Sequence, residues 1–405
     1  MSTHKCEVVR ILLEEHPNAD SLSVVKVHGY ECAVRTQDWN DGDLAVYIPP
    51  DSTVPDTEPF KFLGDSRRIR VRKFRGRYSQ GLLVPAPEGT QEGDDCMEMM
   101  GIEHYEPPLP MKSGGENEKG PEGFFPVYDI EDYNRYADAV FESGEEVVAT
   151  EKIHVASAKF VCAPDIKSAQ DLLATAIQLG EELPDSDLGG MLEHIGRARG
   201  RITSSQAICD LECISEGGGV RFIGNNSTIP SEWNHKADFI AEHIQKAIIN
   251  LKGRIWAGSR KNWKKHDEKV WWWQAVVQTP RIEEWCRAHP GLALYGEVFG
   301  PTQKMKYGAK QNQMLFRAFD ILDKDRWLDY DESRKVGKGL EWVPEVYRDP
   351  LDDARLRALA EEDSSVPGAD HHREGLVVKP ITERHTPEVG RVQLKLKSNR
   401  YLAKN

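Results

Sequence analysis

Five short segments, in a fixed order between residues 150 and 398, place the strongest constraint on how this chain of 405 residues folds. They supply a lysine that can act as a nucleophile, carboxylates, a pair of phenylalanines and further lysines near the end of the chain. An amine can bond to the phosphorus of a nucleotide, carboxylates can hold a divalent metal ion, and lysines can neutralise phosphate charge. The inventory therefore predicts covalent attack on a nucleotide phosphate. The segments are Thr150–His154, Tyr295–Gly300, Phe316–Ile321, Glu374–Lys379 and Leu394–Ser398.

In this order the segments resemble motifs I, III, IIIa, IV and V of the covalent nucleotidyltransferases, the superfamily of ATP-dependent DNA and RNA ligases and mRNA-capping guanylyltransferases. His154 stands two residues after Lys152, where DNA ligases and capping enzymes usually have aspartate, and is similar to the RNA ligase 2 branch. Residues 1–105 resemble the N-terminal oligonucleotide-binding (OB) module of Deinococcus-type RNA ligases, which seal nicks bearing a 3′-OH RNA end. The resemblance implies an ATP-dependent RNA ligase that joins 3′-OH and 5′-phosphate ends.

The resemblance also implies roles for individual residues. Lys152 would form the covalent lysyl–AMP intermediate, and His154 would support the later steps on the nucleic acid. Glu297 and Glu374 would hold a Mg²⁺ or Mn²⁺ ion, and Glu297 would also contact the ribose. Glu151 would contribute to the ATP site.

Further cofactor contacts are expected from motifs IIIa and V and from a basic strand. Phe319 would stack on adenine, which contributes about 1–3 kcal/mol of binding free energy; the alternative is that Phe316 and Phe319 both belong to a hydrophobic core. Lys395 and Lys397 alternate along a strand, so both project from one face toward the triphosphate. Arg260 is the expected partner of the nucleotide or of the 5′-phosphate.

One position departs from the family pattern. Val155 replaces the glycine that follows the motif I histidine, and Ala156–Lys159 replace the usual Thr-Asn pairing. Valine restricts the backbone and adds a branched side chain where glycine allows close approach. An RNA-binding protein with an impaired ligase-like active site is therefore the alternative interpretation.

Domain order distinguishes this chain from the other classes of protein that carry related motifs or an OB domain. A DNA ligase or a capping enzyme would carry its OB domain after motif V, whereas here the predicted barrel precedes Lys152. A tRNA-binding OB module fused to an unrelated domain would leave the later motifs unexplained.

The predicted fold class is α+β with three parts. Short apolar runs separated by turn signals predict an OB-fold β-barrel in residues 1–105, either binding nucleic acid or purely structural. Residues 106–128 are rich in Pro, Gly and charge and predict an exposed linker. Residues 129–405 would form a nucleotidyltransferase domain of antiparallel sheets with flanking helices. Helical periodicity predicts a largely helical insertion at about 163–252, in which 204–213 and 220–224 are expected to be short strands or loops.

A dense basic stretch interrupts an otherwise acidic chain of net charge −13. Interleaved apolar residues would let these cations face a polyanion such as RNA or an RNA-containing duplex with a nick. The alternative is a basic edge strand that resists aggregation. The stretch comprises Arg67, Arg68, Arg70, Arg72, Lys73, Arg75 and Arg77.

Composition limits the remaining classes. There is no apolar run of membrane-spanning length and no apolar signal core at residues 1–6, and seven cysteines are expected to be reduced thiols. The expectation is a monomeric, cytoplasmic protein. Cys209 and Cys213 have a spacing that zinc tolerates, but no second pair lies near them.

Overall fold

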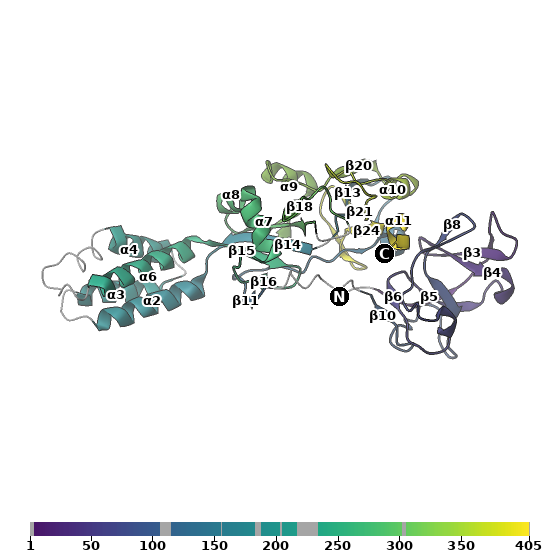
Figure 1. Cartoon of the computed structure of the whole chain (residues 1–405), viewed down its shortest axis with the longest axis horizontal. Coiled ribbons are helices and arrows are strands. Elements are labelled where there is room, and N and C mark those ends of the chain that lie inside the picture. The colour runs from purple at the N-terminus through teal and green to yellow at the C-terminus, as the bar shows by residue number, and fades with distance from the viewer. Residues whose placement is uncertain are drawn as a thin grey trace.

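The computed structural model describes residues 4–105, 115–154, 156–182, 188–202, 205–216, 234–301 and 305–404. Three bodies lie in a row, with a helical bundle at one end, two sheets in the middle and a small barrel at the other end (Figure 1). Among the described helices, none is long and apolar enough to cross a membrane.

The N-terminal module is built from short antiparallel strands around two hydrophobic clusters. Alternate residues of its central strand face the two sides, so Val46 and Ile48 pack in one cluster and Ala45 and Tyr47 in the other. Its sheets have the orders β1-β5-β9, β2-β3-β4, β6-β10 and β7-β8. The strands are β1 (Glu7–Arg10), β2 (Glu14–Glu15), β3 (Leu22–Val27), β4 (Tyr30–Arg35), β5 (Leu44–Ile48), β6 (Ser52–Thr53), β7 (Arg72–Phe74), β8 (Arg77–Ser79), β9 (Leu82–Pro85) and β10 (Glu103–His104), with 3₁₀ turns at Thr36–Asp38 and Lys61–Leu63.

The described half of the predicted linker belongs structurally to the next domain. β11 (Asn117–Glu118) pairs with β16 (Trp263–Lys264) at the edge of a seven-stranded sheet, and Glu118 forms an ion pair with Arg254 at 2.7 Å. Tyr128, at the end of this segment, is buried. Residues 106–114 lie outside the described residues.

A seven-stranded sheet of order β11-β16-β15-β14-β17-β18-β19 forms the first half of the central domain. Helices α7 and α8 cover one face, where even-numbered residues of β14 such as Phe160 pack with Trp272 and Trp285. The opposite face carries the odd-numbered residues of β14. The elements are β14 (Ala156–Ala163), β15 (Arg254–Ser259), β16 (Trp263–Lys264), α7 (Trp271–Gln278), α8 (Pro280–Ala288), β17 (Leu292–Phe299), β18 (Leu315–Asp323) and β19 (Arg326–Trp327).

A five-stranded sheet of order β12-β24-β21-β13-β20 forms the second half. Leu376, Val378, Leu394 and Leu396 pack on one of its faces with Leu356 of α10. β12 runs parallel to β24, and the other neighbours are antiparallel. The elements are β12 (Glu131–Asp132), α1 (Tyr133–Val140), β13 (Glu146–Glu151), α9 (Tyr330–Val336), β20 (Glu345–Pro350), α10 (Asp353–Ala360), β21 (Gly375–Pro380), β22 (His385–Thr386), β23 (Gly390–Arg391), β24 (Leu394–Lys397) and α11 (Asn399–Lys404).

The helical insertion leaves the sheet at the end of β14 and returns at the start of β15. It consists of α2 (Ile166–Glu181), α3 (Leu188–Gly200), α4 (Ser205–Glu216) and α6 (Asn234–Lys252), which share a core of their own. The expectation of strands or loops at 204–213 is wrong, because Ala207 and Leu211 lie one helical turn apart and both pack into that core. Residues 220–224 lie outside the described residues.

Candidate active site

Lys152 lies in the short connection between β13 and β14, where it faces a buried carboxylate. Its backbone N–H donates to the Gly375 carbonyl oxygen at 2.9 Å, which fixes the connection against the start of β21. Its Nζ lies 2.8 Å from Oε1 of Glu374, whose side chain is 4% exposed. Motifs I and IV are therefore joined through one ion pair.

Several basic side chains surround Glu374. His154 Nδ1 lies 3.3 Å from its Oε2, and Lys397 also acts on it. Burial alone would raise the pKa of Glu374, but Lys152 and His154 outweigh burial and hold that pKa well below its usual range. Glu374 is therefore ionised at neutral pH. His154 faces its Oε2, and Lys152 faces its Oε1.

His154 is enclosed by two tyrosines that the sequence motifs do not contain. The Tyr307 hydroxyl accepts a hydrogen bond from the His154 backbone N–H at 2.9 Å. The Tyr401 hydroxyl, from α11, lies 3.5 Å from His154 Nδ1. Burial raises the pKa of Tyr307, and the charges of Glu374, Glu151 and Glu297 raise it further. Tyr307 lies in a stretch that follows motif III and resembles the RNA ligase 2 branch, but the sequence assigned a role to neither tyrosine.

The two lysines of motif V lie on the same side of β24 and differ in their partners. Lys397 Nζ lies 2.8 Å from Oδ2 of Asp51, which belongs to the N-terminal module. Burial would lower the pKa of Lys397, but Asp51 and Glu374 raise it. Burial and the neighbouring Lys397 lower the pKa of Lys395 to about 8. Lys395 makes no ion pair with any described residue.

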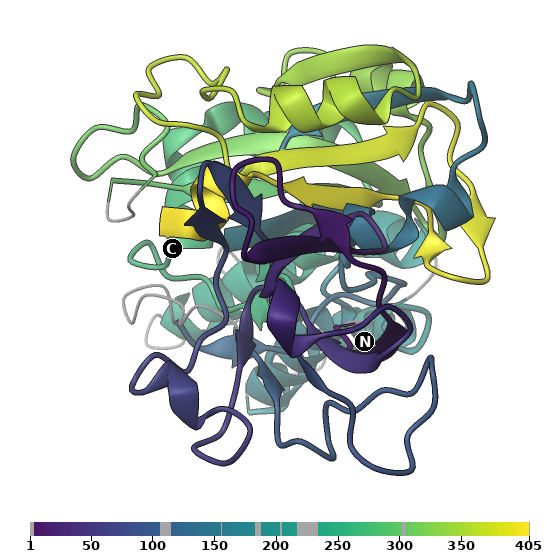
Figure 2. The same ribbon diagram turned by 90° about the vertical axis from the view of Figure 1, so that its right-hand side faces the viewer.

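Asp51 is a site residue that the sequence analysis missed. Arg68 also pairs with it, at 2.6 Å, so one carboxylate from the small barrel holds two cations beside the catalytic sheet. Figure 2 looks from this end and shows the strands of the barrel in front of the C-terminal strands and α11.

Glu151 points toward a loop rather than toward the motif lysines. Its Oε1 accepts from the Ser364 hydroxyl at 2.5 Å and its Oε2 accepts from the Ser365 backbone N–H at 2.7 Å. Burial raises the pKa of Glu151 despite these two bonds. Both oxygens are therefore already engaged by the protein.

Glu297 and Phe319 lie on the sheet face that α7 and α8 leave uncovered. Leu294 and Val298 of β17 pack under those helices, so Glu297 projects to the other side. Phe319 is half-buried, and its ring centroid lies 4.5 Å from that of Tyr128. Phe316, by contrast, is a core residue packed edge-on against Phe160, as the alternative for it expected.

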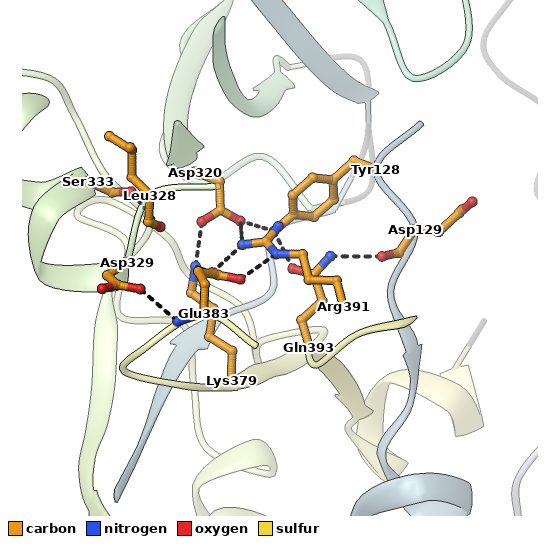
Figure 3. A network of polar contacts seen from close by, with 10 residues as sticks. All are labelled: Tyr128, Asp129, Asp320, Leu328, Asp329, Ser333, Lys379, Glu383, Arg391 and Gln393. Atoms are coloured by element: carbon orange, nitrogen blue, oxygen red, sulfur yellow. Dashed lines mark hydrogen bonds and ion pairs between the residues drawn. The ribbon is translucent and has the colours of Figure 1, made fainter. Parts of the chain in front are cut away.

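Arg260 and Lys379, the lysine of motif IV, both have carboxylate partners within the protein, and Figure 3 shows the contacts of Lys379. Arg260 pairs with Asp129. Lys379 Nζ donates to Asp320 Oδ1 at 2.5 Å, so this lysine is neutralised within the protein. Tyr128, Asp320, Glu383, Arg391 and Gln393 complete the network, which ties β18 to the five-stranded sheet.

Comparison with known proteins fixes the family. A model of RNA ligases matches residues 145–397, more than half of the chain. The chain belongs to the RNA ligase family. A model of an OB-fold domain matches residues 6–86, which confirms the predicted barrel.

Solved structures resemble the whole ligase chain. An RNA ligase variant of Naegleria gruberi with ATP and Mn is 19% identical at a TM-score of 0.64, over 99% of this chain and 98% of that one. The same organism's RNA ligase with pyrophosphate is 20% identical at 0.63, over 99% and 98%. Another variant, with AMP and Mn, is 20% identical at 0.64, over 99% of both chains. These likenesses confirm the fold class. No curated protein matches the sequence.

The basic stretch of the ligase divides into paired and exposed residues. Arg67 pairs with Asp56, Arg68 with Asp51, and Arg77 with Glu31. Arg70, Arg72, Lys73 and Arg75 are exposed on or beside the β7–β8 hairpin, together with Phe74, which is 42% exposed. The hairpin thus presents four cations and an aromatic ring to solvent.

A groove of about 570 Å³ runs between the barrel and the catalytic domain of the ligase. Its lining includes Lys26, Arg77, Arg357 and Lys397, so cations from both bodies border it. The predicted site residues Lys152, His154, Glu374, Lys395 and Lys397 lie together, and Lys397 also lines the groove. Val155, where the family has glycine, lies outside the described residues.

Proposed function

We propose that this RNA ligase joins a 3′-OH end to a 5′-phosphate end in three steps, with ATP as the source of AMP. The observation that carries the proposal is the position of Lys152 against Glu374, with both motif V lysines beside them. Related structures that hold ATP, AMP or pyrophosphate support ATP as the nucleotide.

In the first step Lys152 loses its proton and attacks the α-phosphorus of ATP. A bond forms between Nζ and phosphorus, the bond from phosphorus to the bridging oxygen breaks, and pyrophosphate leaves. Lys395 and Lys397 stand where they can neutralise the triphosphate and the leaving group. Phe319 offers an aromatic face for the base, and Glu297 lies on the same side of the sheet.

The carboxylates fit a divalent ion that keeps much of its water. Among the described residues no three His, Cys, Asp or Glu side chains gather to hold a metal alone. Mg²⁺ usually binds through one or two carboxylates together with substrate phosphates, and Glu374 is a buried carboxylate that is ionised at neutral pH. Glu374 and Glu297 would hold such an ion, which stabilises negative charge on the phosphate oxygens.

In the second step an oxygen of the RNA 5′-phosphate attacks the AMP phosphorus and displaces Lys152, which leaves as an amine. In the third step the 3′-OH attacks the 5′-phosphorus, and AMP departs as the phosphodiester forms. His154 lies beside Glu374 and is suited to supporting these later steps. Arg260 would have to exchange Asp129 for a phosphate in order to take part.

The exposed cations of the β7–β8 hairpin supply an RNA-contacting surface for this reaction. Arg70, Arg72, Lys73 and Arg75 suit the phosphate backbone, and Phe74 suits an unstacked base. Binding should therefore weaken with rising salt. A monomeric, cytoplasmic enzyme is part of the same proposal.

The test is covalent labelling with α-³²P-ATP and Mn²⁺, followed by a denaturing gel. We expect label on the wild type, release of that label by pyrophosphate, and no label on Lys152→Ala. Absence of label on folded wild-type protein that carries no bound AMP would support the RNA-binding alternative. Val155→Gly would then report whether that position causes the loss.

A further inference from the structure

Lys159 is a buried lysine that the proposed reaction does not use. It lies on β14, is 3% exposed, and its side chain runs over Gly258 of β15, where a Cβ atom would come within 3.0 Å of its Cε. Its Nζ lies 4.7 Å from the centroid of the Trp263 ring. A cation–π contact replaces only part of the hydration that an ammonium loses on burial.

Three other lysines around the nucleotide face have carboxylate partners, whereas Lys159 and Lys395 have none among the described residues. No carboxylate, amide or carbonyl oxygen among the described residues accepts a hydrogen bond from Lys159, and no described carboxylate pairs with it. Burial is the sole cause that lowers the pKa of Lys159, to about 8. The paired lysines are Lys152 with Glu374, Lys379 with Asp320 and Lys397 with Asp51.

Strand register places Lys159 on the same face as the candidate metal carboxylate. Lys159 pairs with Tyr295 across β17, and Ser157, two residues earlier, pairs with Glu297. Residues two apart on a strand share a face and lie about 7 Å apart. The helix-covered side of the sheet is occupied by Ala158 and Phe160, so Lys159 faces the other side, where Tyr128, Trp263 and Tyr295 also pack.

We propose that Lys159 binds a phosphate group of the reaction, carried either by the nucleotide or by the RNA end. The proposal rests on the ligase function proposed above and adds a phosphate-binding residue outside the five motifs. A phosphate supplies the acceptor oxygens that this ammonium lacks within the protein. Lys395 is the parallel case, since it also lacks an ion pair among the described residues and lies where the triphosphate is expected.

A second buried lysine provides a matched control. Lys264, on β16, is also buried, lies 5.3 Å from the ring centroid of Trp272, and has its pKa lowered by burial. It faces the opposite side of the sheet and donates to Asn117 Oδ1 at 2.9 Å. Lys159→Met and Lys264→Met therefore remove comparable buried charges from opposite faces.

The experiment has two arms, both measured on full-length protein beside an active wild type. One arm follows the rate of lysyl adenylylation against ATP concentration. The other loads each protein with AMP first, then follows a single turnover of AMP transfer to a 5′-phosphorylated RNA. We expect Lys159→Met to lose about 10- to 100-fold in one arm, and Lys264→Met to lose activity in neither. Loss in the ATP arm identifies the nucleotide phosphate, and loss in the RNA arm identifies the 5′-phosphate.

Thermal unfolding separates a binding role from a structural one. Removal of an uncompensated buried charge should leave the melting temperature of Lys159→Met unchanged or raised, whereas Lys264→Met loses a hydrogen bond and should melt lower. Two results overturn the proposal: activity within twofold of wild type in both arms, or a marked fall in the melting temperature of Lys159→Met. A wild type that takes no label instead rejects the ligase function itself.

Discussion

The barrel and the helical bundle are both additions to the two catalytic sheets, but they attach in opposite ways. The barrel reaches into the site, through Asp51 to Lys397, Tyr30 to Asp132 at 2.6 Å and Gln80 to Asn399 at 2.9 Å. The bundle surrounds its own core and projects from the far end of β14 and β15 (Figure 1). Among the described ion pairs, its anchor to the sheet is Asp165 with Arg254 at 2.9 Å. An added domain thus takes part in chemistry only where it contributes side chains to the site.

The largest effect is expected from Asp51→Ala, which removes the contact of the barrel with Lys397. Removing one partner of a buried ion pair leaves the other charge without a partner and costs about 3–5 kcal/mol. The Asp51 and Lys397 side chains are 11% and 23% exposed, so most of this cost should apply. We expect lysyl adenylylation to fall about tenfold or more. Because Asp51 raises the pKa of Lys397, the alkaline limb of the pH–rate profile should also move to lower pH.

The matched control is Asp56→Ala, since Asp56 pairs with Arg67 at the surface of the same module. Exposed pairs contribute about 0–1 kcal/mol, so this variant should label like the wild type. Equal labelling by Asp51→Ala and the wild type would mean that docking of the barrel does not serve the first step.

A smaller effect is expected from acid, which should lower the stability of the catalytic sheets more than that of the bundle. Glu374 has a folded-state pKa well below its usual value of 4.5, so the stability it contributes is full above about pH 4.5 and is lost as pH falls toward the folded value. Bundle pairs such as Glu242 with Lys246 are exposed and contribute little. Thermal melts from pH 6 to 3 should therefore show the catalytic sheets losing stability before the bundle, with a weaker pH dependence in Glu374→Gln. Parallel loss at both ends would contradict this.

The smallest effect is expected from excision of the bundle. Ala163 and Arg254 are direct partners across β14 and β15, so a two-residue Asn-Gly turn can replace residues 164–253 and close a β-hairpin. We expect the shortened protein to label with AMP within about threefold of the wild type, because the ion pairs of the site join no described side chain of the bundle. Circular dichroism should show the loss of helix. Loss of labelling in a folded shortened protein would give the bundle a role in the first step.

The sequence predicted the site residues that lie in short motifs. It missed those that reach the site only through contacts between distant segments. Lys152, Glu374 and Lys397 were predicted from adjacent residues, and the fold brings them together. Asp51 was missed because its partner Lys397 is 346 residues away and no local pattern marks it. Tyr307 and Tyr401 were missed for the same reason, since each acts on His154 through tertiary packing.

The basic stretch shows a related limit. Charge density alone does not say which cations the protein itself neutralises, and Arg67, Arg68 and Arg77 all have carboxylate partners. Helix type in the insertion was predictable from periodicity at α2 and α6. It was not at α4, where a short segment with turn-forming serines depends on packing into the bundle.

Because of the ion pair between Lys152 and Glu374, the lysine and a metal ion would compete for the same carboxylate. One oxygen of Glu374 is occupied by Lys152, so the contact that orders the lysine also covers the carboxylate proposed to hold the metal ion. A cation that took the place of Lys152 on this carboxylate would free the amine for attack. Under the proposed function, binding of the metal and release of the lysine would then be a single event.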